Sequence, residues 1–95
     1  MALQFEWDPR KAATNRAKHG VTFEEAATAF GDPLGRITED PRQPAGEERF
    51  ALLAQSARAR LLVVLFTERG ERVRLISARP ATRPERRAYE EAQQR

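Results

Sequence analysis

The sequence predicts an α+β fold: one compact domain over residues 1–95, in which an antiparallel sheet has helices packed on it. The first observation is the order of the periodic segments, which read β-α-α-β-β-β-β-α along the chain. The second is that the last three strands follow one another with short turns, which favours hairpins and antiparallel pairing. The third is the length, because 95 residues suffice for one domain and not for two.

Local signals predict the first strand and the first helix. Apolar and polar residues alternate over residues 3–7, which is typical of a strand with one buried face. Asp8 and Pro9 are the residue types preferred at a helix start, and Gly20 is the type preferred just after a helix end. We therefore expect a helix between them, with the only histidine, His19, in its last turn.

A second helix, a strand and a loop follow. Thr22 and Glu25 have the spacing of a capping box, in which each side chain accepts a hydrogen bond from the other residue's backbone amide. This predicts a helix over residues 23–30, and a strand is expected over residues 34–38. Residues 39–48 contain two prolines, a glycine and four acids, which indicates a loop.

The second half is predicted to contain three strands. They are expected over residues 49–55, 60–67 and 71–78, and the middle strand is apolar on both faces, which predicts that both faces are covered. Alternation divides the last strand into one face with Val73, Leu75 and Ser77 and another with Arg72, Arg74, Ile76 and Ala78.

The last predicted helix begins at a second capping box. Thr82 and Glu85 have the required spacing, and the helix is expected to run to about residue 92. The aromatic side chains assigned to the core are Phe5, Trp7, Phe23, Phe30, Phe50 and Phe66.

Composition excludes several classes of protein. The chain has no cysteine, so disulfides, thiolate chemistry and zinc ribbons are excluded. Residues 1–8 hold two acids and no apolar run, so no signal peptide is expected. The longest apolar run, residues 61–66, is far shorter than the roughly 20 residues that span a membrane. We therefore expect a cytoplasmic protein with no membrane partner.

Positive charge gathers near the end of the sequence. The net charge is +3, and residues 69–95 hold eight bases against four acids, whereas residues 21–48 hold two against seven. Fifteen of the seventeen bases are arginine, whose planar head forms forked hydrogen bonds with phosphate or carboxylate. Two interpretations stay open: a surface for a polyanion, or the solvated surface of an arginine-rich chain.

Motifs in both halves resemble one known family. The first half contains Phe5-Glu6-Trp7-Asp8-Pro9, Lys11-Ala12, Asn15, Lys18-His19-Gly20 and Phe23-Glu24-Glu25-Ala26. The second half contains Gly46-Glu47-Glu48-Arg49-Phe50, Ile76-Ser77-Ala78-Arg79, Thr82, Glu85-Arg86 and Tyr89-Glu90. None of these motifs is specific alone, but together they resemble the BrnT toxins over nearly the whole chain. The chain departs from the family pattern where Pro80 and Pro84 replace bases expected beside the last helix.

The resemblance implies a RelE-like ribonuclease fold and a role as the toxin of a bacterial type II toxin–antitoxin pair. The toxins of this family cut RNA and thereby inhibit translation and growth. The implied partner is a BrnA-like ribbon-helix-helix antitoxin, which forms a hetero-oligomer with the toxin and supplies the contact with operator DNA. RNA, free or on the ribosome, is the implied substrate.

Cleavage of RNA by its own 2′-hydroxyl requires a base, an acid for the leaving 5′-oxygen, and positive charge beside the phosphorus. No metal or other cofactor is expected, because the chain has one histidine and the acids of residues 39–48 lack ligand spacing. The catalytic candidates are Lys18, His19, Arg49, Arg79 and Tyr89. The candidates for holding the RNA backbone are Lys11, Arg72, Arg74, Arg83 and Arg86.

Each candidate also has a purely structural interpretation. His19 would then be an ordinary helix-end residue, Tyr89 a core side chain, and the arginines members of surface ion pairs, such as Arg79 with Glu85. The alternative function for the whole chain is a module that binds RNA or a protein without cutting. A DNA-binding regulator is disfavoured, because no helix–turn–helix is apparent in the sequence.

Overall fold

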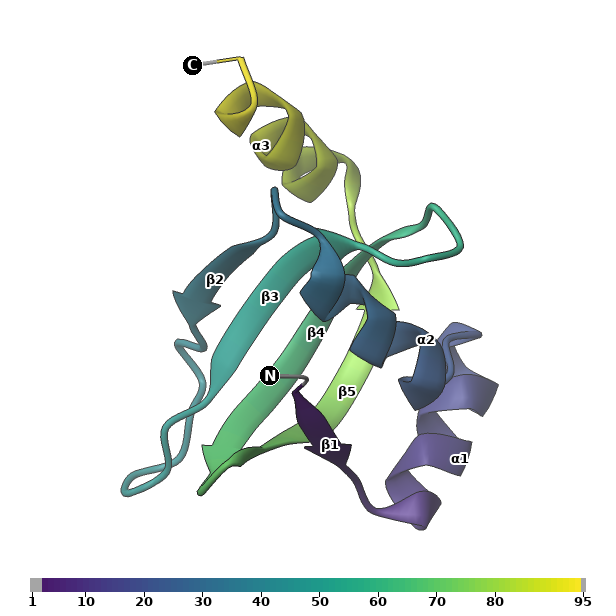
Figure 1. The fold of residues 1–95 in the computed structure, drawn as a ribbon, viewed down its shortest axis with the longest axis vertical. Coiled ribbons are helices and arrows are strands. Elements are labelled where there is room, and N and C mark those ends of the chain that lie inside the picture. Colours follow the sequence, from purple (N-terminus) through teal and green to yellow (C-terminus); the bar gives the residue numbers. More distant parts are fainter. Residues whose placement is uncertain (1–2, 95) are drawn as a thin grey trace.

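The computed structural model describes residues 3–94 and shows a five-stranded sheet of order β1-β5-β4-β3-β2 (Figure 1). The elements along the chain are β1 (Gln4–Glu6), α1 (Pro9–His19), α2 (Phe23–Thr28), the 3-10 turn η1 (Ala29–Gly31), β2 (Arg36–Glu39), β3 (Phe50–Gln55), β4 (Leu61–Arg69), β5 (Arg72–Pro80) and α3 (Arg83–Ala92). The predicted α+β class and the predicted order of elements are both confirmed. No helix among the described residues is long and apolar enough to cross a membrane.

The sheet is antiparallel from β2 to β5, and its fifth strand differs. β1 pairs with β5 in parallel, with Gln4 opposite Arg72 and Glu6 opposite Arg74. The prediction of a wholly antiparallel sheet is therefore wrong at this edge. Short hairpin turns determine the antiparallel direction of β3, β4 and β5. No such turn joins β1 to its partner β5, because the two strands are far apart in the sequence.

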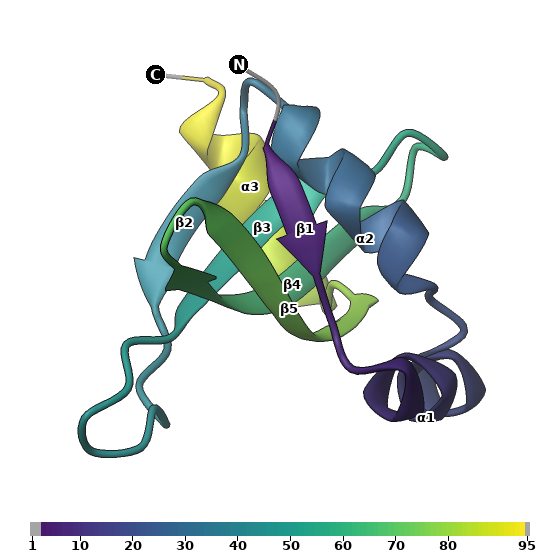
Figure 2. The ribbon, with the colours of Figure 1, turned by 60° about the horizontal axis from the view of Figure 1, so that its bottom comes forward.

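The helices lie mainly on one side of the sheet. α2 and η1 lie over one face, and α1 lies beside β5 (Figure 2). The hydrophobic core is formed between them and the sheet by Val21, Phe23, Ala26, Ala29, Leu52, Ala54, Leu62, Val64, Phe66, Val73, Leu75 and Ala78. The aromatic core assignments are confirmed: two of the six rings are buried, and the other four pack against this cluster.

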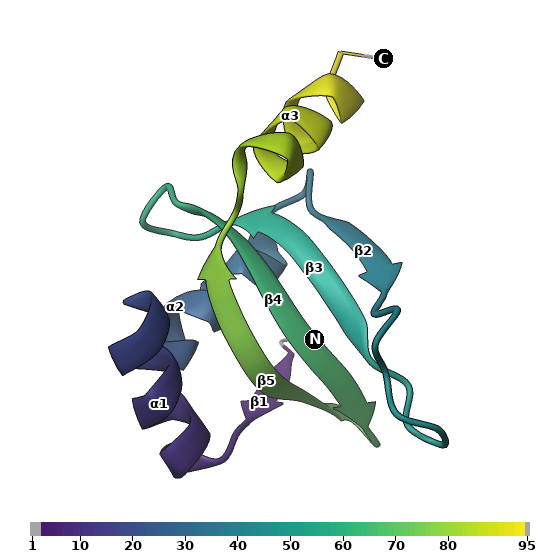
Figure 3. The same cartoon turned by 180° about the vertical axis from the view of Figure 1, so that it is seen from behind.

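The opposite face of the sheet has less cover. Viewed from behind, the strands are free of helices except where α3 lies across one end (Figure 3). Val63, near that end, is buried, whereas Leu65, two residues further along β4, is only half-buried. The predicted cover on both faces of β4 is therefore confirmed only at the end near α3, because a single ten-residue helix reaches this side.

A register shift changes which residues of β5 face the core. Leu65 is opposite Ser77, but the next residue, Phe66, is opposite Leu75, so Ile76 is an extra residue in β5. Beyond this bulge Ala78 is fully buried in place of Ser77. The predicted face assignment is correct up to Leu75 and wrong beyond it, since an extra residue reverses the alternation.

The helix ends follow the predicted capping, with one exception. The Asp8 side chain accepts from the Arg10 amide at 2.8 Å, and Gly20 ends α1 with a left-handed φ of 70°. Both halves of the capping box at the start of α3 are present. At α2 the Thr22 hydroxyl accepts from the Glu25 amide at 3.1 Å, but the Glu25 carboxylate binds elsewhere. The predicted reciprocal box is therefore half formed.

Candidate active site

A basic cleft lies between α1 and β5, and we call it the α1–β5 cleft. It has a volume of about 300 Å³ and is lined by Arg10, Lys11, Thr14, Asn15, Lys18, His19, Ile76 and Ser77. Three of the predicted site residues meet here: Lys11, Lys18 and His19. Lys11 and Lys18 are seven residues apart on α1, so they project from the same side of the helix. No acid lines the cleft, which makes it suited to an anion such as phosphate.

Asn15 fixes the distance between the two walls of the cleft. β1 pairs only with the first residues of β5, which leaves the outer edge of β5 free near Ala78. The Ala78 amide donates to Asn15 Oδ1 at 2.9 Å, and Asn15 Nδ2 donates to the Ala78 carbonyl at 2.8 Å. Nδ2 also donates to the Val21 carbonyl at 2.9 Å. Asn15 is 5% exposed, so it acts as a buried clamp between α1 and β5.

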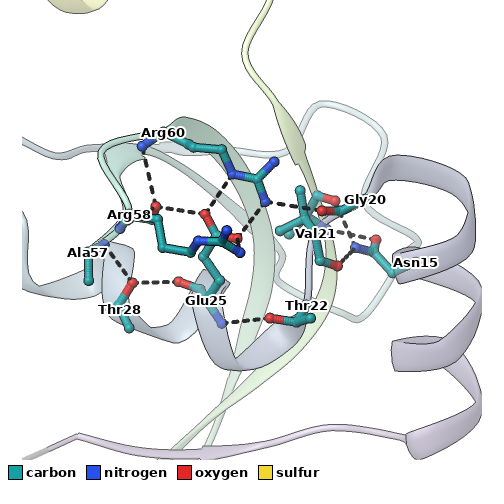
Figure 4. Close-up of polar contacts among 11 residues, drawn as sticks. Asn15, Gly20, Val21, Thr22, Glu25, Thr28, Ala57, Arg58 and Arg60 are labelled. Carbon is teal, nitrogen blue, oxygen red and sulfur yellow. Dashed lines mark hydrogen bonds and ion pairs between the residues drawn. The ribbon is translucent and has the colours of Figure 1, made fainter.

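The end of α1 that carries His19 is held from a second side (Figure 4). Arg60 Nη2 donates to the carbonyl of Gly20 at 3.0 Å, which satisfies an acceptor left free at the helix end. His19 is half-buried in the last turn, where the helix dipole favours a positive charge. The backbone around His19 is therefore fixed by Arg60 as well as by Asn15.

A buried carboxylate anchors Arg60 in turn. Arg60 Nε donates to Glu25 Oε2 at 2.8 Å, Arg60 Nη2 donates to Oε1, and the Ser56 hydroxyl donates to Oε2 at 2.8 Å (Figure 4). The hydrogen bond from Arg60 is the main cause that lowers the pKa of Glu25, against the opposing effect of burial. This ion pair explains why Glu25 does not complete the predicted capping box: its side chain links α2 to the β3–β4 hairpin.

Arg79 lies near the cleft but is already paired. It follows Ser77 by two residues on the same face of β5, so the two side chains are separated by about 7 Å. Its Nη1 and Nη2 donate to the two carboxylate oxygens of Glu85 at 2.8 and 2.9 Å. This hydrogen-bonded pair lowers the pKa of Glu85 to about 2. A phosphate that binds Arg79 must therefore compete with Glu85.

Two catalytic candidates lie away from the cleft. Arg49 precedes β3 at the other end of the sheet, where its Nε donates to Glu47 at 3.2 Å. Tyr89 is buried on α3, and its hydroxyl donates to Asp32 Oδ2 at 2.6 Å. Burial, together with Asp32, raises the pKa of Tyr89 to about 12. The structure does not bring either residue to Lys18 and His19, and their catalytic role stays a prediction.

The remaining backbone-binding candidates fall into two groups. Arg74 donates to Glu6 at 2.7 Å and Arg72 lies 4.0 Å from the same carboxylate, at the β1 end of β5. Arg83 and Arg86 are exposed on α3, and neither forms an ion pair with another residue in the range 3–94. Only the second group offers free cations.

Sequence reasoning missed five residues of the cleft as contributors to the site: Arg10, Thr14, Asn15, Ile76 and Ser77. A signal was present, because Lys11, Asn15 and Lys18 have the spacing of one helix face. The wall formed by β5 gave no such signal in the sequence. Ser77 faces away from the core only because of the bulge at Ile76, and simple alternation along the strand does not predict a bulge.

The described residues contain no group of three or more histidine, cysteine, aspartate or glutamate side chains placed to hold a metal ion. The chemistry available in the α1–β5 cleft is therefore that of ammonium, imidazole, guanidinium and hydroxyl groups. These groups can bind a phosphodiester and exchange protons with it.

Comparison with known proteins identifies a family and a solved structure of similar fold. A family model described as the ribonuclease toxin BrnT of a type II toxin–antitoxin system matches residues 7–85. The 1.1 Å crystal structure of the Brucella abortus ribonuclease toxin BrnT is similar in fold, with a TM-score of 0.64 and 26% sequence identity, over 86% of this chain and 100% of that chain. The search against curated protein sequences found no match. The matched residues include both walls of the α1–β5 cleft and end inside α3.

Proposed function

Because the chain belongs to the BrnT family of ribonuclease toxins of type II toxin–antitoxin systems, we propose that it cuts RNA in the α1–β5 cleft without a metal ion. The observation that carries this proposal is the meeting of Lys11, Lys18 and His19 in one cleft that no acid lines. We further propose a RelE-like arrangement of the site and a BrnA-like ribbon-helix-helix antitoxin as the partner that neutralises the toxin in the cytoplasm.

The chemistry begins at the RNA itself. The 2′-hydroxyl loses its proton and attacks the adjacent phosphorus, and the bond to the 5′-oxygen breaks as that oxygen gains a proton. The products are a 2′,3′-cyclic phosphate and a 5′-hydroxyl, so no water, metal or cofactor is consumed. His19 carries the only imidazole in the sequence, and imidazole can both accept and donate a proton, so His19 is the group best suited to exchange a proton here.

The positive side chains stabilise the phosphate as its charge increases. Lys18 lies beside His19, and Lys11 lies two helical turns earlier along the same wall. Arg79 lies two residues beyond the cleft residue Ser77 on β5, and it supplies a forked contact once its bond with Glu85 is exchanged for one with phosphate. A donor that is already in place at the phosphate is worth about 2.7–4 kcal/mol in the transition state, and Arg79 contributes less by the cost of breaking its bond with Glu85.

Arg83 and Arg86 extend the positive surface beyond the cleft. They lie on α3, close in sequence to Arg79, and they are exposed. We therefore assign them to the RNA backbone flanking the cleaved bond. Arg72 and Arg74 contribute less, because Glu6 already neutralises part of their charge.

One observation favours a second candidate function. Within residues 3–94 Arg79 is held by Glu85, and His19 is the only histidine, so the chain could bind RNA without completing the reaction. This non-catalytic module would still occupy the α1–β5 cleft, and only a cleavage assay separates the two functions.

The test is incubation of the purified chain with an RNA oligonucleotide in excess EDTA. We expect cleavage to persist and to leave 2′,3′-cyclic or 3′-phosphate ends. An oligonucleotide with a single 2′-deoxyribose at the cleavage site is the matched control, and it must remain intact. Loss of cleavage in EDTA with recovery in magnesium would contradict the mechanism, and binding without cleavage would support the second candidate.

A further inference from the structure

The outer edge of β2 is an exposed strand edge that no helix covers (Figure 1, Figure 3). All four residues of β2 are exposed, and β2 is the last strand of the sheet at this side. Ile37 is 59% exposed and Leu34, just before β2, is 51% exposed. These are two of the three large hydrophobic residues exposed among residues 3–94. Apolar surface is therefore concentrated at one edge of the molecule.

The backbone of β2 is ready to pair with another strand. The Asp40 amide donates to the Arg49 carbonyl, and Thr38 is opposite Ala51 in the register with β3. In an antiparallel pair alternate residues face the partner strand, so the peptide groups of Arg36 and Thr38 point toward β3. Those of Ile37 point outward. β2 has no proline, lysine or bulge, three features that block pairing at an edge, although two of its four residues, Arg36 and Glu39, are charged.

A cleft continues from this edge toward α3. It has a volume of about 450 Å³ and is lined by Leu34, Arg36, Ala88, Glu91, Ala92 and Gln93. A second cleft of about 280 Å³ shares Arg36 and Ala88 with it and extends over the open face of the sheet to Val63 and Glu85. Arg36 lies between the two clefts and forms no ion pair with any other described residue, although Glu91 lines the first cleft and Glu85 the second, so its guanidinium can still pair with a carboxylate of a partner.

We propose that the β2 edge binds an extended segment of the antitoxin as a sixth strand of the sheet. The segment places an apolar side chain beside Ile37 on one face and a carboxylate beside Arg36 on the other, because successive residues of a strand project to opposite faces. Beyond the strand it continues into the cleft between β2 and α3. The inference rests on the proposed function only in that an antitoxin partner exists.

Two other occupants fit this surface less well. RNA is disfavoured, because the edge presents the apolar Ile37 and Leu34 together with the acidic Glu39. A second copy of this chain could pair through its own β2, but a four-residue strand on each side buries much less than the roughly 1,200 Å² of a stable interface. An antitoxin segment is not limited in this way, since it can also fill the adjoining clefts.

The position of this surface indicates how binding could silence the toxin. β2 and β1 are the two edges of the sheet, and α1 with its catalytic candidates lies on the β5 side, away from β2. The second cleft, however, ends at Glu85, which holds Arg79. A segment that fills this cleft keeps α3 in place, and Arg79 then stays bound to Glu85 and is withheld from the substrate.

The experiment compares two matched substitutions of exposed hydrophobic residues. Ile37→Asp alters the β2 edge, and Leu3→Asp alters a residue of similar exposure just before β1 at the opposite edge. The binding of the purified cognate antitoxin to each purified variant is measured by titration calorimetry. We expect Ile37→Asp to weaken binding by about 100-fold, a typical effect for a central interface residue, and Leu3→Asp to leave it unchanged. Normal binding by Ile37→Asp, or equal loss in both variants, would overturn the proposal.

A backbone substitution tests the strand pairing itself. Ile37→Pro removes an outward amide that β3 does not use, so the pairing of β2 with β3 is retained. We expect it to lose antitoxin binding while keeping the thermal unfolding midpoint within a few degrees of wild type. Arg36→Glu serves as the second variant, and it should weaken binding through charge repulsion even if proline proves disruptive. Wild-type affinity in Arg36→Glu would contradict the predicted carboxylate contact.

Separate readouts keep this inference distinct from the proposed function. Each variant expressed without antitoxin must still cut RNA, because Ile37 and Arg36 do not line the α1–β5 cleft. If the wild-type chain does not cut RNA but still binds antitoxin through Ile37, the proposed function fails and the docking surface stands. If light scattering shows a dimer of the chain alone that Ile37→Pro makes monomeric, the occupant is a second copy and the proposal is wrong.

Discussion

Asn15 on α1 and Ala78 on β5 exchange two hydrogen bonds, so a side-chain amide takes the place of a neighbouring strand at the edge of the sheet. The same side chain holds the Val21 carbonyl, just after α1 ends. The spacing of the two cleft walls is therefore set by one residue, and the first prediction concerns its removal.

Replacing Asn15 with alanine should lower both stability and cleavage. The amide and carbonyl of Ala78 and the carbonyl of Val21 lose their partners in a buried place, and we expect the free energy of unfolding to fall by about 3 kcal/mol. Urea denaturation measures this loss. The control is Thr67→Val, which removes another buried hydrogen bond, from the Thr67 hydroxyl to the Glu48 carbonyl, at the far end of the sheet. Equal cleavage by the two folded variants would contradict the positioning role of Asn15.

Replacing His19 with glutamine should reduce cleavage without unfolding the protein. General acid–base catalysis typically contributes about 10²–10⁴-fold, so we expect kcat to fall within that range. The urea midpoint should move little, because His19 is only half-buried. Arg16→Gln, an exposed substitution on the same helix that does not line the cleft, is the control. An unchanged kcat in His19→Gln would remove the histidine from the mechanism.

Replacing Arg79 with alanine should lower the cleavage rate by about 10²–10³-fold, the effect of losing one transition-state donor. Lysine at this position should restore only part of the rate, because it keeps the charge and loses the fork. Stability should change by no more than about 1 kcal/mol, since the pair with Glu85 is partly exposed to water. Cleavage rate and thermal midpoint are measured on the same samples, and a fully active alanine variant with a normal midpoint would exclude Arg79.

The pair between Arg79 and Glu85 also predicts an acid-dependent loss of stability. The hydrogen bond with Arg79 lowers the pKa of Glu85 to about 2 in the folded protein, from an ordinary value of 4.5. The pair therefore contributes its full stabilisation above pH 4.5 and loses it progressively as the pH falls toward 2. Thermal midpoints measured between pH 6 and pH 2 should fall less steeply in Glu85→Gln than in wild type. Parallel curves would contradict the prediction, and Glu90→Gln, an exposed substitution on the same helix, is the control.

Replacing Tyr89 with phenylalanine tests whether its hydroxyl acts in catalysis or in packing. The variant loses only the hydrogen bond to Asp32, so we expect a loss of about 1.5–3 kcal/mol in unfolding free energy, as for a bond to a charged group. Because Tyr89 does not line the α1–β5 cleft, kcat should stay near wild type. A large fall in kcat with normal stability would instead support the catalytic role predicted from the sequence.

Signals between near neighbours made most of the fold predictable. Asp8, Thr22 and Thr82 marked helix starts, and the short turns after β3 and β4 determined the direction of those strands. The parallel pairing of β1 was not predictable in this way, because its partner β5 lies more than sixty residues away. The same limit applies to the site. Lys18 and His19 were recognisable within one helix, whereas Ala78 as the partner of Asn15 depends on distant packing.

Glu25 shows how a local signal can be outweighed by a distant one. The spacing from Thr22 was correct for a capping box, and the Thr22 half is present. A guanidinium from the β3–β4 hairpin offers the carboxylate stronger, charge-assisted hydrogen bonds than a backbone amide does. Nothing in the sequence near Glu25 indicates that Arg60 will lie next to its carboxylate. The role of Glu25 in linking α2 to the β3–β4 hairpin could therefore not be predicted.

The pairing of β1 with β5 has a consequence for how this chain folds during its synthesis on the ribosome. β1 can pair with β5 only after β5, which ends at Pro80, has emerged from the exit tunnel. The α1–β5 cleft has the same requirement, since one of its walls is β5. Synthesis proceeds from the N-terminus and contacts between distant segments form late in folding. The growing polypeptide therefore has no assembled α1–β5 cleft, and so lacks the nuclease site that we propose, until β5 has emerged from the tunnel.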